Sequence, residues 1–424
     1  MARKMKDSGI GWIGKIPEGW EIHRIKTHFS IISGSGFKPE LQGQSTGDFP
    51  VCKASDISSS GHYLHTSANY ITSDIVKSQH FSIIPKGSIL FAKIGEAMRK
   101  NNRSLCSLDC CVDNNCQGLV PKNISSEFSY YLFTCIDMTW FDNAGTIPCI
   151  NNQKLYDCRI PFPSYGEQTL IANHLNIQCA KINEMLFHIR SSIEEYKKLK
   201  QAIITQAVTK GVRGEREMKD SGVEWTGEIP VNWTIQRFAR VAEVKSNLVS
   251  PDNYLEYPQI SPENIEKDSG KLLLPCRTVA EVGVISGNHL FYKGQILYSK
   301  IRPKLNKVCI APFDGLCSAD MYPIESKNDT RYIMYCILSN GFLQQVSMIT
   351  ENRVKMPKIN QVELSKVLVA IPETIAEQKE IADYLDAKCT EIDGLIAKKE
   401  QLVKELEGYK KSLIYEVVTG KREV

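Results

Sequence analysis

The sequence predicts an α+β protein: two mixed domains in tandem repeat, joined by two long helices that form an antiparallel coiled coil with pseudo-two-fold symmetry. Three observations predict this fold. Sequence motifs recur at an offset of about 210 residues along the chain. Each half ends in a long segment with a seven-residue apolar repeat, and short apolar runs between turn residues fill the rest of each half. We expect a first domain over residues 1–165, a helix over 166–212, a second domain over 213–374 and a second helix over 375–424.

Length and composition are those of an ordinary globular protein, with 424 residues, of which 42% are hydrophobic and 24% charged. The formal net charge is only +4 at pH 7, so a surface that binds nucleic acid must be a local concentration of basic residues. No stretch approaches the roughly 20 apolar residues of a membrane helix, and no apolar run follows the N-terminal basic residues as it would in a signal peptide. We therefore expect a cytoplasmic protein.

A short motif opens each half of the chain. Residues 5–24 and 218–237 share 12 identities in 20 positions at a constant offset of 213. Chance would give about one identity. The shared pattern is Met-Lys-Asp-Ser-Gly-x-x-Trp-x-Gly-x-Ile-Pro-x-x-Trp. We expect the same entry structure at the start of both domains.

Within each domain, a repeated strand-like block, at residues 86–94 and 293–301, leads into a basic loop. Residues 93–103 carry four basic residues against one acid, and residues 300–307 carry four basic residues and no acid. Lysine and arginine neutralise phosphate, while arginine and asparagine can form paired hydrogen bonds with base edges. Because the loops recur at one place in both halves, we favour DNA contact over ordinary solvated loops. The candidate residues are Lys93, Arg99, Lys100, Arg103, Lys300, Arg302, Lys304 and Lys307.

Three further segments are weaker candidates for DNA contact. Loops 33–38 and 245–247 occupy similar early positions in the two halves, and segment 352–358 precedes the last strand of the second half. Each combines basic or amide side chains with turn residues. The candidate residues are Lys38, Asn247, Arg353 and Lys355.

The closing segments, 167–209 and 377–419, contain no proline and each follows one. Their seven-residue apolar spacing predicts a coiled coil. The residues expected to pack between the helices are Leu175, Ile182, Ile189, Leu385, Ile392 and Leu406. The second apolar position of the seven-residue repeat, which we call the companion position, is filled by Ile171, Met185, Leu199, Ile381, Leu395, Leu402 and Tyr409. Lys399 interrupts the apolar pattern of the second segment. The alternative to a coiled coil is that each helix packs only against its own domain.

The sequence contains no recognisable catalytic centre. Neither G-x-x-x-x-G-K-[ST] nor G-x-G-x-x-G occurs, and the eight histidines show no metal-ligand spacing. Among the 14 cysteines, Cys106, Cys110, Cys111 and Cys116 form the tightest group, but their spacing differs from the paired C-x2-C of zinc sites. We expect buried or incidental thiols there, with a metal site as the alternative, and no disulfides in a reducing cytoplasm.

The repeated motifs resemble those of the specificity subunits of type I restriction–modification enzymes, over essentially the whole chain. The resemblance rests on the entry motif, on the strand–Pro–Glu-Gln entry to each helix at 160–168 and 371–378, and on the Val-Thr pairs at 208–209 and 418–419. It implies a non-catalytic subunit whose two domains, 1–165 and 213–374, are target-recognition domains. Each would read one half of a split, asymmetric double-stranded DNA target. The two helices would be spacers that set the distance between the half-sites and dock two methyltransferase subunits.

The resemblance also implies which cofactors the complex uses. None belongs to this chain. S-adenosylmethionine would serve the methyltransferase partner, which methylates adenine, and ATP and Mg would serve the restriction subunits that join the full complex. Two alternatives stay open: a coiled-coil adaptor whose domains bind proteins, and a specificity subunit for a fused nuclease–methyltransferase.

Overall fold

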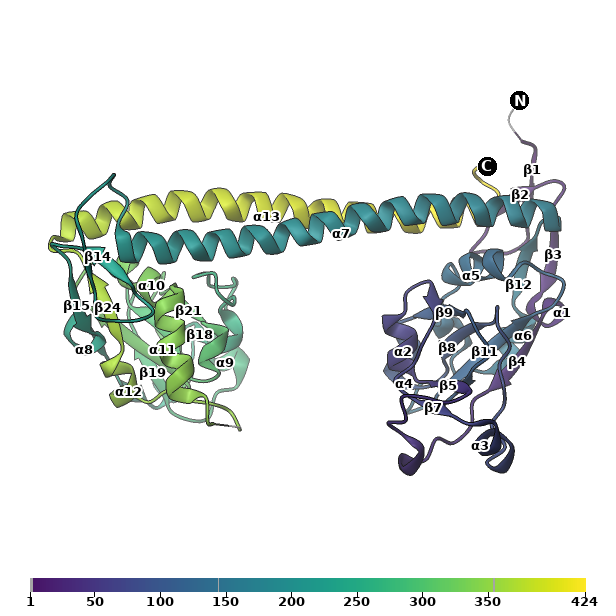
Figure 1. Cartoon of the computed structure of the whole chain (residues 1–424), viewed down its shortest axis with the longest axis horizontal. Coiled ribbons are helices and arrows are strands. Elements are labelled where there is room, and N and C mark those ends of the chain that lie inside the picture. Colours follow the sequence, from purple (N-terminus) through teal and green to yellow (C-terminus); the bar gives the residue numbers. More distant parts are fainter. Residues whose placement is uncertain (1–2, 144, 354) are drawn as a thin grey trace. The chain divides into compact units, whose positions relative to one another are not determined.

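The computed structural model describes residues 3–143, 145–353 and 355–424. They form two compact units: unit 1 consists of residues 1–188 and 402–424, and unit 2 consists of residues 189–401. The division passes through both long helices, α7 (Tyr165–Lys210) and α13 (Ile375–Val418). Each unit therefore contains one globular domain and one segment of each helix (Figure 1).

Each domain opens with the same small hairpin, which explains the repeated entry motif. In unit 1, β1 (Met5–Asp7) pairs with β2 (Lys15–Pro17), and in unit 2, β13 (Met218–Asp220) pairs with β14 (Glu228–Pro230). The aspartate that ends the first strand accepts a hydrogen bond at 2.9 Å from the amide of the glycine two residues later in both units. That glycine has a φ near +70° in both units, a conformation that few other residues adopt. The shared Asp-Ser-Gly letters therefore encode a turn.

A mixed sheet forms the centre of unit 1, and its middle strand β8 is buried along its whole length. The strands of this sheet, in spatial order, are β4 (Phe29–Ser33), β11 (Cys116–Pro121), β8 (Ile89–Ala92), β9 (Arg103–Cys106) and β6 (Tyr63–Leu64). The other strands are β10 (Cys111–Val112), β5 (Phe49–Cys52) and β7 (Tyr70–Ile71) in a second sheet, and β12 (Arg159–Phe162) paired with β3 (Glu21–Arg24). The short helices are α1 (Ile25–His28), η1 (Pro39–Leu41), α2 (Ala54–Ser59), α3 (Ser73–Ser78), α4 (Gly95–Arg99), α5 (Ser126–Thr134), η2 (Met138–Phe141) and α6 (Asn152–Asp157).

Unit 2 repeats this plan, with β20 in the place of β8 and α10 in the place of α5. Its central strands, in spatial order, are β16 (Ala242–Val244), β23 (Met321–Ser326), β20 (Ile296–Ser299) and β21 (Val308–Ile310). The other strands are β17 (Leu248–Val249), β19 (Asn288–Phe291), β22 (Gly315–Cys317) and β18 (Gln259–Ile260) in a second sheet, and β15 (Thr234–Arg237) paired with β24 (Leu368–Ile371). The short helices are α8 (Phe238–Val241), η3 (Pro251–Asn253), η4 (Pro262–Asn264), α9 (Val279–Val282), η5 (Pro303–Leu305), α10 (Thr330–Leu338), α11 (Asn340–Thr350) and α12 (Gln361–Lys366).

A tryptophan and a glutamate join the start of the long helix to its domain in each unit. In unit 1, the indole N–H of Trp20 donates to Glu167 at 2.9 Å, and in unit 2 the indole N–H of Trp233 donates to Glu377 at 3.2 Å. Both indoles are fully buried, so the carboxylate supplies the partner that a buried N–H requires. The repeated letters Trp and Glu-Gln therefore mark a joint between domain and helix.

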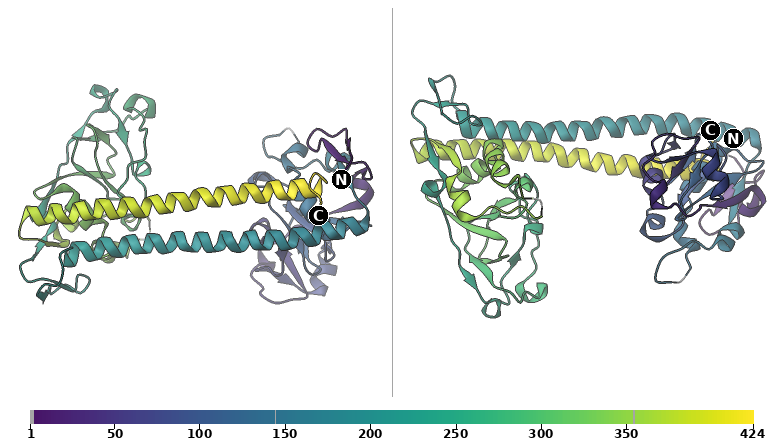
Figure 2. Two further views of the ribbon diagram at one scale, coloured as in Figure 1. Left: turned by 90° about the horizontal axis from the view of Figure 1, so that it is seen from above. Right: turned by 60° about the horizontal axis from the view of Figure 1, so that its bottom comes forward.

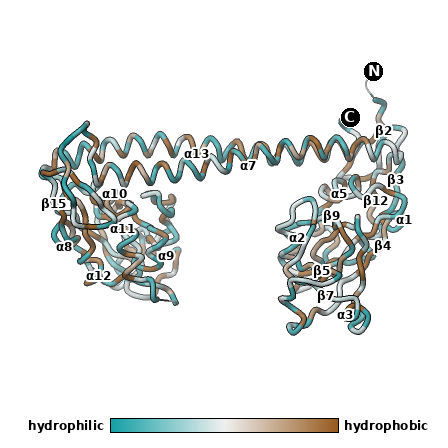
Figure 3. Tube along the Cα trace, in the orientation of Figure 1, coloured by the Kyte–Doolittle hydropathy of each residue, from teal (hydrophilic) through white to brown (hydrophobic). Residues whose placement is uncertain are grey.

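Both long helices are continuous, and apolar residues recur along them among polar ones (Figures 2 and 3). Leu175, Ile182, Leu385 and Ile392 are buried, while Ile189 and Leu406 are half-buried. The prediction that the companion positions also pack inward is wrong for five of the seven residues, because their side chains are exposed. These exposed residues are Met185, Leu199, Leu395, Leu402 and Tyr409.

The second buried row of each helix lies four residues after the first row, not three. In α7 this row is formed by Cys179, Leu186 and Ile193, all of them buried. The row that we expected is interrupted by the polar residues Gln178 and Ser192. Continuity of apolar residues, rather than the size of single side chains, therefore decides which row faces inward.

Two lysines at inward positions of unit 2 have specific partners. Lys399 lies 5.5 Å from the ring centroid of Tyr196, so the interruption of the pattern is a cation–π contact between α13 and α7. Lys200 is buried, and its ammonium lies 2.9 Å from both carboxylate oxygens of Asp393. Lys271, from the domain, reaches the same carboxylate at 2.7 Å. This ionic group ties both helix segments to the domain within unit 2.

Candidate nucleic-acid interface

In unit 2, main-chain hydrogen bonds attach the basic loop after β20 to the segment before α12. The amide of Ile359 donates to the carbonyl of Lys300 at 3.0 Å, and the amide of Arg302 donates to the carbonyl of Pro357 at 2.8 Å. These two segments are separated by about 50 residues of sequence and are predicted separately as DNA-contacting segments. The structure brings them side by side.

Loop 245–247 reaches the same place. The side-chain amide of Gln361, the first residue of α12, donates to Ser246 Oγ at 2.6 Å. The main chain of the loop is held because the amide of Lys245 donates to the carbonyl of Pro323 in β23 at 2.8 Å. Asn247, beside Ser246, is exposed. Three segments that the sequence predicts as candidates therefore converge within unit 2.

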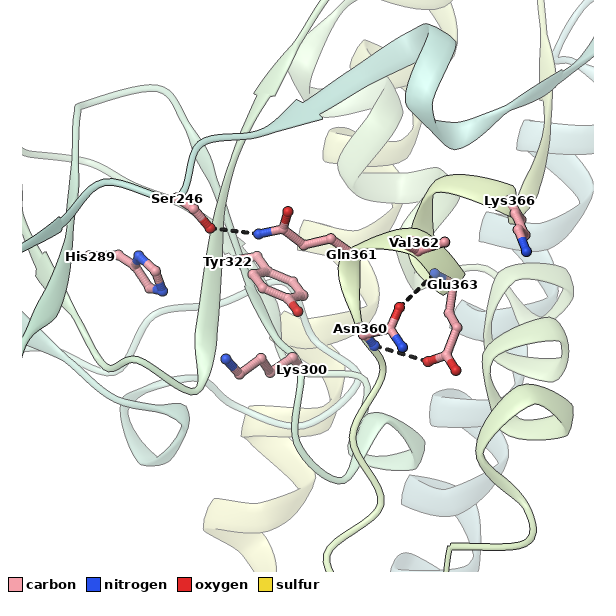
Figure 4. Close-up of a pocket in the computed structure, with 9 residues that line it drawn as sticks. All are labelled: Ser246, His289, Lys300, Tyr322, Asn360, Gln361, Val362, Glu363 and Lys366. Atoms are coloured by element: carbon pink, nitrogen blue, oxygen red, sulfur yellow. Dashed lines mark hydrogen bonds between the residues drawn. The ribbon is translucent and has the colours of Figure 1, made fainter.

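Side chains at this junction line an open hollow of about 630 Å³ (Figure 4). The ammonium of Lys300 lies 5.2 Å from the ring centroid of Tyr322, and His289 of β19 lines the hollow beside them. On the side of α12, Asn360 Oδ1 accepts from the amide of Glu363 at 2.9 Å, which caps the helix. The hollow thus combines two lysines, a carboxylate, an aromatic ring, an imidazole and amide groups.

The four basic residues of loop 300–307 differ in what they can bind. Arg302 and Lys304 are exposed, and among the described residues neither side chain has an ion pair or a hydrogen-bond partner. Lys307 donates to the carbonyl of Pro262 at 2.6 Å, so its ammonium is engaged within the domain. Arg302 and Lys304 are therefore the cations of this loop that are best placed to meet phosphate.

Segment 352–358 contributes one exposed cation and one that is engaged. Val354 lies outside the described residues. Lys355 is exposed. Arg353 pairs with Glu363 at 2.5 Å and donates to the carbonyl of Lys358, and the carboxylate raises the pKa of the Arg353 guanidinium. Arg353 therefore fixes the loop to α12.

The same framework occurs in unit 1, where Lys93 takes the place of Lys300. The amide of Lys93 donates to the carbonyl of Asn115 at 2.8 Å, and its carbonyl accepts from Ile150 at 2.9 Å. In unit 2, the amide of Lys300 donates in the same way to Asp320, at 3.0 Å. These matched main-chain contacts establish which positions of the two domains correspond.

The other candidates of unit 1 lie on its surface, apart from Arg103. Lys38 and Lys100 are exposed, and Arg99 forms an exposed ion pair with Glu96 at 2.8 Å. Surface ion pairs of this kind contribute little to stability, so Arg99 can exchange its partner for phosphate at small cost.

Arg103 lies inside unit 1, because it is the first residue of β9 rather than the end of a loop. It is only 6% exposed, and its guanidinium donates to the carbonyls of Phe133 and Ile136 and to Asn101 Oδ1. Burial lowers the pKa of Arg103 to about 10, which leaves it charged at pH 7. It binds the carbonyls at the end of α5, and we therefore leave it out of the proposed DNA surface.

Replacing Arg103 by methionine is expected to destabilise unit 1 by about 2 kcal/mol, since buried carbonyls lose a charged donor. Urea unfolding of the full chain measures this change. Arg99→Met, four residues earlier on the surface, is the matched control and should leave the unfolding midpoint unchanged. Equal midpoints for the two variants would contradict a structural role for Arg103.

Most residues of the hollow, among them His289, Tyr322 and Gln361, are not predicted from the sequence. These three belong to β19, β23 and α12, and strand pairing brings these elements together. Their positions relative to Lys300 are not encoded in local sequence.

The cysteine group of unit 1 lies in the core. Cys106, Cys110, Cys111 and Cys116 are free and buried, and burial raises the pKa of Cys111 to about 11. Across the residues that the structure describes, no group of three or more histidine, cysteine, aspartate or glutamate side chains is arranged to hold a metal ion. The thiols fill the apolar space between sheets of unit 1. Of the helices in the described part of the chain, none has the length and apolar character that crossing a membrane requires.

Comparison with known proteins gives a consistent result. The family described as "Type I restriction modification DNA specificity domain" matches residues 17–195 and 230–405. The EcoDI specificity subunit of a type I restriction enzyme from Escherichia coli is 38% identical over 278 residues, 62% of this chain and 62% of that protein, which is less than two thirds of its length. The MjaIX specificity subunit from Methanocaldococcus jannaschii is 23% identical over 386 residues, 86% of each chain.

A solved structure supports the fold. The chain is similar to one from a study of complex assembly and conformational transition of the type I R-M system, with a TM-score of 0.67 and 14% sequence identity. The similarity covers 96% of this chain and 99% of that chain. It therefore extends over both domains and both helices.

Proposed function

Because this chain belongs to the family of type I restriction–modification DNA specificity domains, we propose that it is the DNA-specificity subunit of such a system. Each domain reads one half of a split, asymmetric target in double-stranded DNA. The observation that carries this proposal is the duplication: two matches to one family domain, each containing a lysine held by the same main-chain contacts. Because the side chains around that lysine differ between the units, the two half-sites differ as well.

The helices form the second part of the proposal. We propose an antiparallel coiled coil with approximate two-fold symmetry, which holds the half-sites about one helical turn of DNA apart, roughly 34 Å. The contacts of Lys200 with Asp393 and of Lys399 with Tyr196 in unit 2 support this pairing, as does that of Lys410 with Asn183 in unit 1. From Tyr196 to Lys200 the position in α7 advances, while the partner in α13 moves back from Lys399 to Asp393, as antiparallel helices require.

The chemistry of the complex would belong to its partners. Two methyltransferase subunits would dock on the helices and methylate adenine with S-adenosylmethionine, and restriction subunits would add ATP- and Mg-dependent cleavage. An adenine amino group inside the duplex is inaccessible, so the base must be turned out of the stack into the partner's site. This chain would hold the DNA in register and supply no bond-making group.

The test is to purify the full chain alone and with a methyltransferase partner encoded beside it. We expect the complex to bind one duplex sequence over others and to methylate adenines in a bipartite motif, read by sequencing modified adenines in the host genome. A coiled-coil adaptor would bind proteins with no DNA preference. A partner that carries nuclease and methyltransferase in one chain would indicate the fused system instead.

Charge at the basic loop gives a second test in that complex. Replacing Arg302 and Lys304 by alanine is expected to reduce the slope of log affinity against log salt by about 0.9 for each phosphate that the loop no longer neutralises. Lys307→Ala is the control, since that ammonium is bound to the carbonyl of Pro262. If the double variant keeps the wild-type slope, loop 300–307 does not meet the DNA.

A further inference from the structure

The hollow of unit 2 contains a buried polar side chain with an unused hydrogen-bonding atom. His289 is 7% exposed, and its Nδ1 is buried without a hydrogen-bond partner among the described residues. A buried polar atom in this state is uncommon, and such atoms are usually satisfied when a ligand or water binds. Figure 4 shows the imidazole beside the space between Ser246 and Lys300. The imidazole lines the hollow, so a group that enters the hollow lies against His289.

The charges that face the imidazole favour its neutral form. Burial lowers the pKa of His289, and the ammonium of Lys300 lowers it further. The carboxylate of Glu363, which also lines the hollow, is engaged by Arg353 and by the amide of Asn360. A neutral imidazole offers one donor and one acceptor, which is the combination that base edges present in the major groove.

The rim of the hollow carries side chains of the kinds that distinguish bases. The Gln361 amide is exposed, and Ser246 is its one hydrogen-bond partner among the described residues, a partner that it can exchange. Glutamine pairs with the N6 and N7 groups of adenine. Val362, next in sequence, is 65% exposed and lines the hollow, and an exposed apolar group of this kind suits the methyl group of thymine.

The corresponding place in unit 1 has a different structure. Gln117 lies two residues after Asn115 in the sequence, as Tyr322 lies two after Asp320. Gln117 is fully buried, and its Nε2 donates to Asn152 Oδ1 at 3.1 Å. The two domains thus share the lysine at this position, which suits phosphate in any sequence, and differ in the groups that surround it.

We propose that the hollow of unit 2 reads a base pair of one half-site, with His289 and Gln361 contacting the base edge and Lys300 the adjacent phosphate. This inference rests on the proposed function and deepens it by assigning specificity to named side chains. His289 is buried in strand β19, whereas Gln361 is exposed at the rim. The reading position belongs to unit 2 alone, so only one half-site depends on it.

The experiment uses the full chain in complex with its methyltransferase partner. The target is first determined from modified adenines, and binding is then measured on duplexes that each carry one base-pair change. We expect Gln361→Ala and His289→Ala to reduce discrimination by about tenfold at one base pair of one half-site. Discrimination in the other half-site should be unchanged. Gln236→Ala is the matched control, since Gln236 donates to Thr234 at 3.1 Å on the surface of the same unit and lies outside the hollow.

The outcomes separate this inference from the proposed function. If the wild-type complex prefers no sequence, the proposed function fails and the inference fails with it. If the wild type is specific and Gln361→Ala keeps its discrimination at every base pair, the inference alone is overturned. A uniform drop in affinity across all duplexes also overturns it, because that result indicates backbone contact. Gln361 is exposed, so this variant keeps the test valid even if His289→Ala fails to fold.

Discussion

Replacing Glu377 by alanine is expected to destabilise unit 2 by about 3–5 kcal/mol, the usual cost of removing one partner of a buried ion pair. Glu377 is 2% exposed and accepts from Arg216 at 2.7 Å and from the indole of Trp233 at 3.2 Å. The substitution leaves a cation and a buried N–H without their partner. Thermal unfolding of the full chain should show the transition of unit 2 at a lower temperature, with that of unit 1 unchanged.

The matched control for this change is Glu380→Ala. Glu380 lies on the same turn of α13 and pairs with Arg213 at 2.7 Å, but both side chains of that pair are about half exposed. An exposed pair contributes at most about 1 kcal/mol. Similar effects of the two substitutions would show that the joint does not depend on the buried carboxylate.

Inserting four residues after Ile189 in α7 and four after Lys399 in α13 is expected to change the DNA target itself. Four helical residues add about 6 Å, close to two base pairs of DNA at about 3.4 Å each. They also turn the helix by about 400°, which nearly restores the apolar stripe. Under the proposed function, the methylated motif should keep both half-sites and gain about two base pairs between them.

An insertion of two residues at each place is the control for this experiment. Two residues rotate the following segment by about 200°, so the apolar stripe would face away from its partner helix. We expect this variant to fail in folding or assembly rather than to change its target. A four-residue variant that methylates the original motif with its original spacing would contradict the role of the helices as a spacer.

The long helices were predictable from the sequence because their pattern is local and sustained. The bounds of α7 lie within two residues of the expected 166–212, whereas α13 begins at the expected residue 375 and ends at Val418, six residues before the expected end at 424. The prediction of which row of residues faces inward is wrong because the row with Met185 and Leu199 is interrupted by the polar residues Gln178 and Ser192. The buried ion pair of Lys200 could not be predicted, since its stability depends on Asp393 in the other helix.

The candidate site was predictable only in part, and the reason is geometric. The repeat located Lys93 and Lys300 at matching positions, because it is a signal within the sequence. Arg103 was counted with its loop, although a strand begins at that residue and directs its side chain inward. His289 joins the hollow through sheet pairing, which no local pattern encodes.

The joint between domain and helix has a consequence for how such a protein can evolve. The side chain of Gln168 accepts from the amide of Ser125 and donates to the carbonyl of Pro163, and Gln378 likewise accepts from the amide of Asp329. Main-chain partners are present whatever side chains a domain carries. A recombination event that exchanged the whole region between the entry hairpin and the helix would therefore preserve these main-chain contacts, although the bond from Gln378 to the side chain of Asn328 depends on the exchanged sequence. Under the proposed function, exchange of a complete domain would change the DNA preference and leave these main-chain contacts in place.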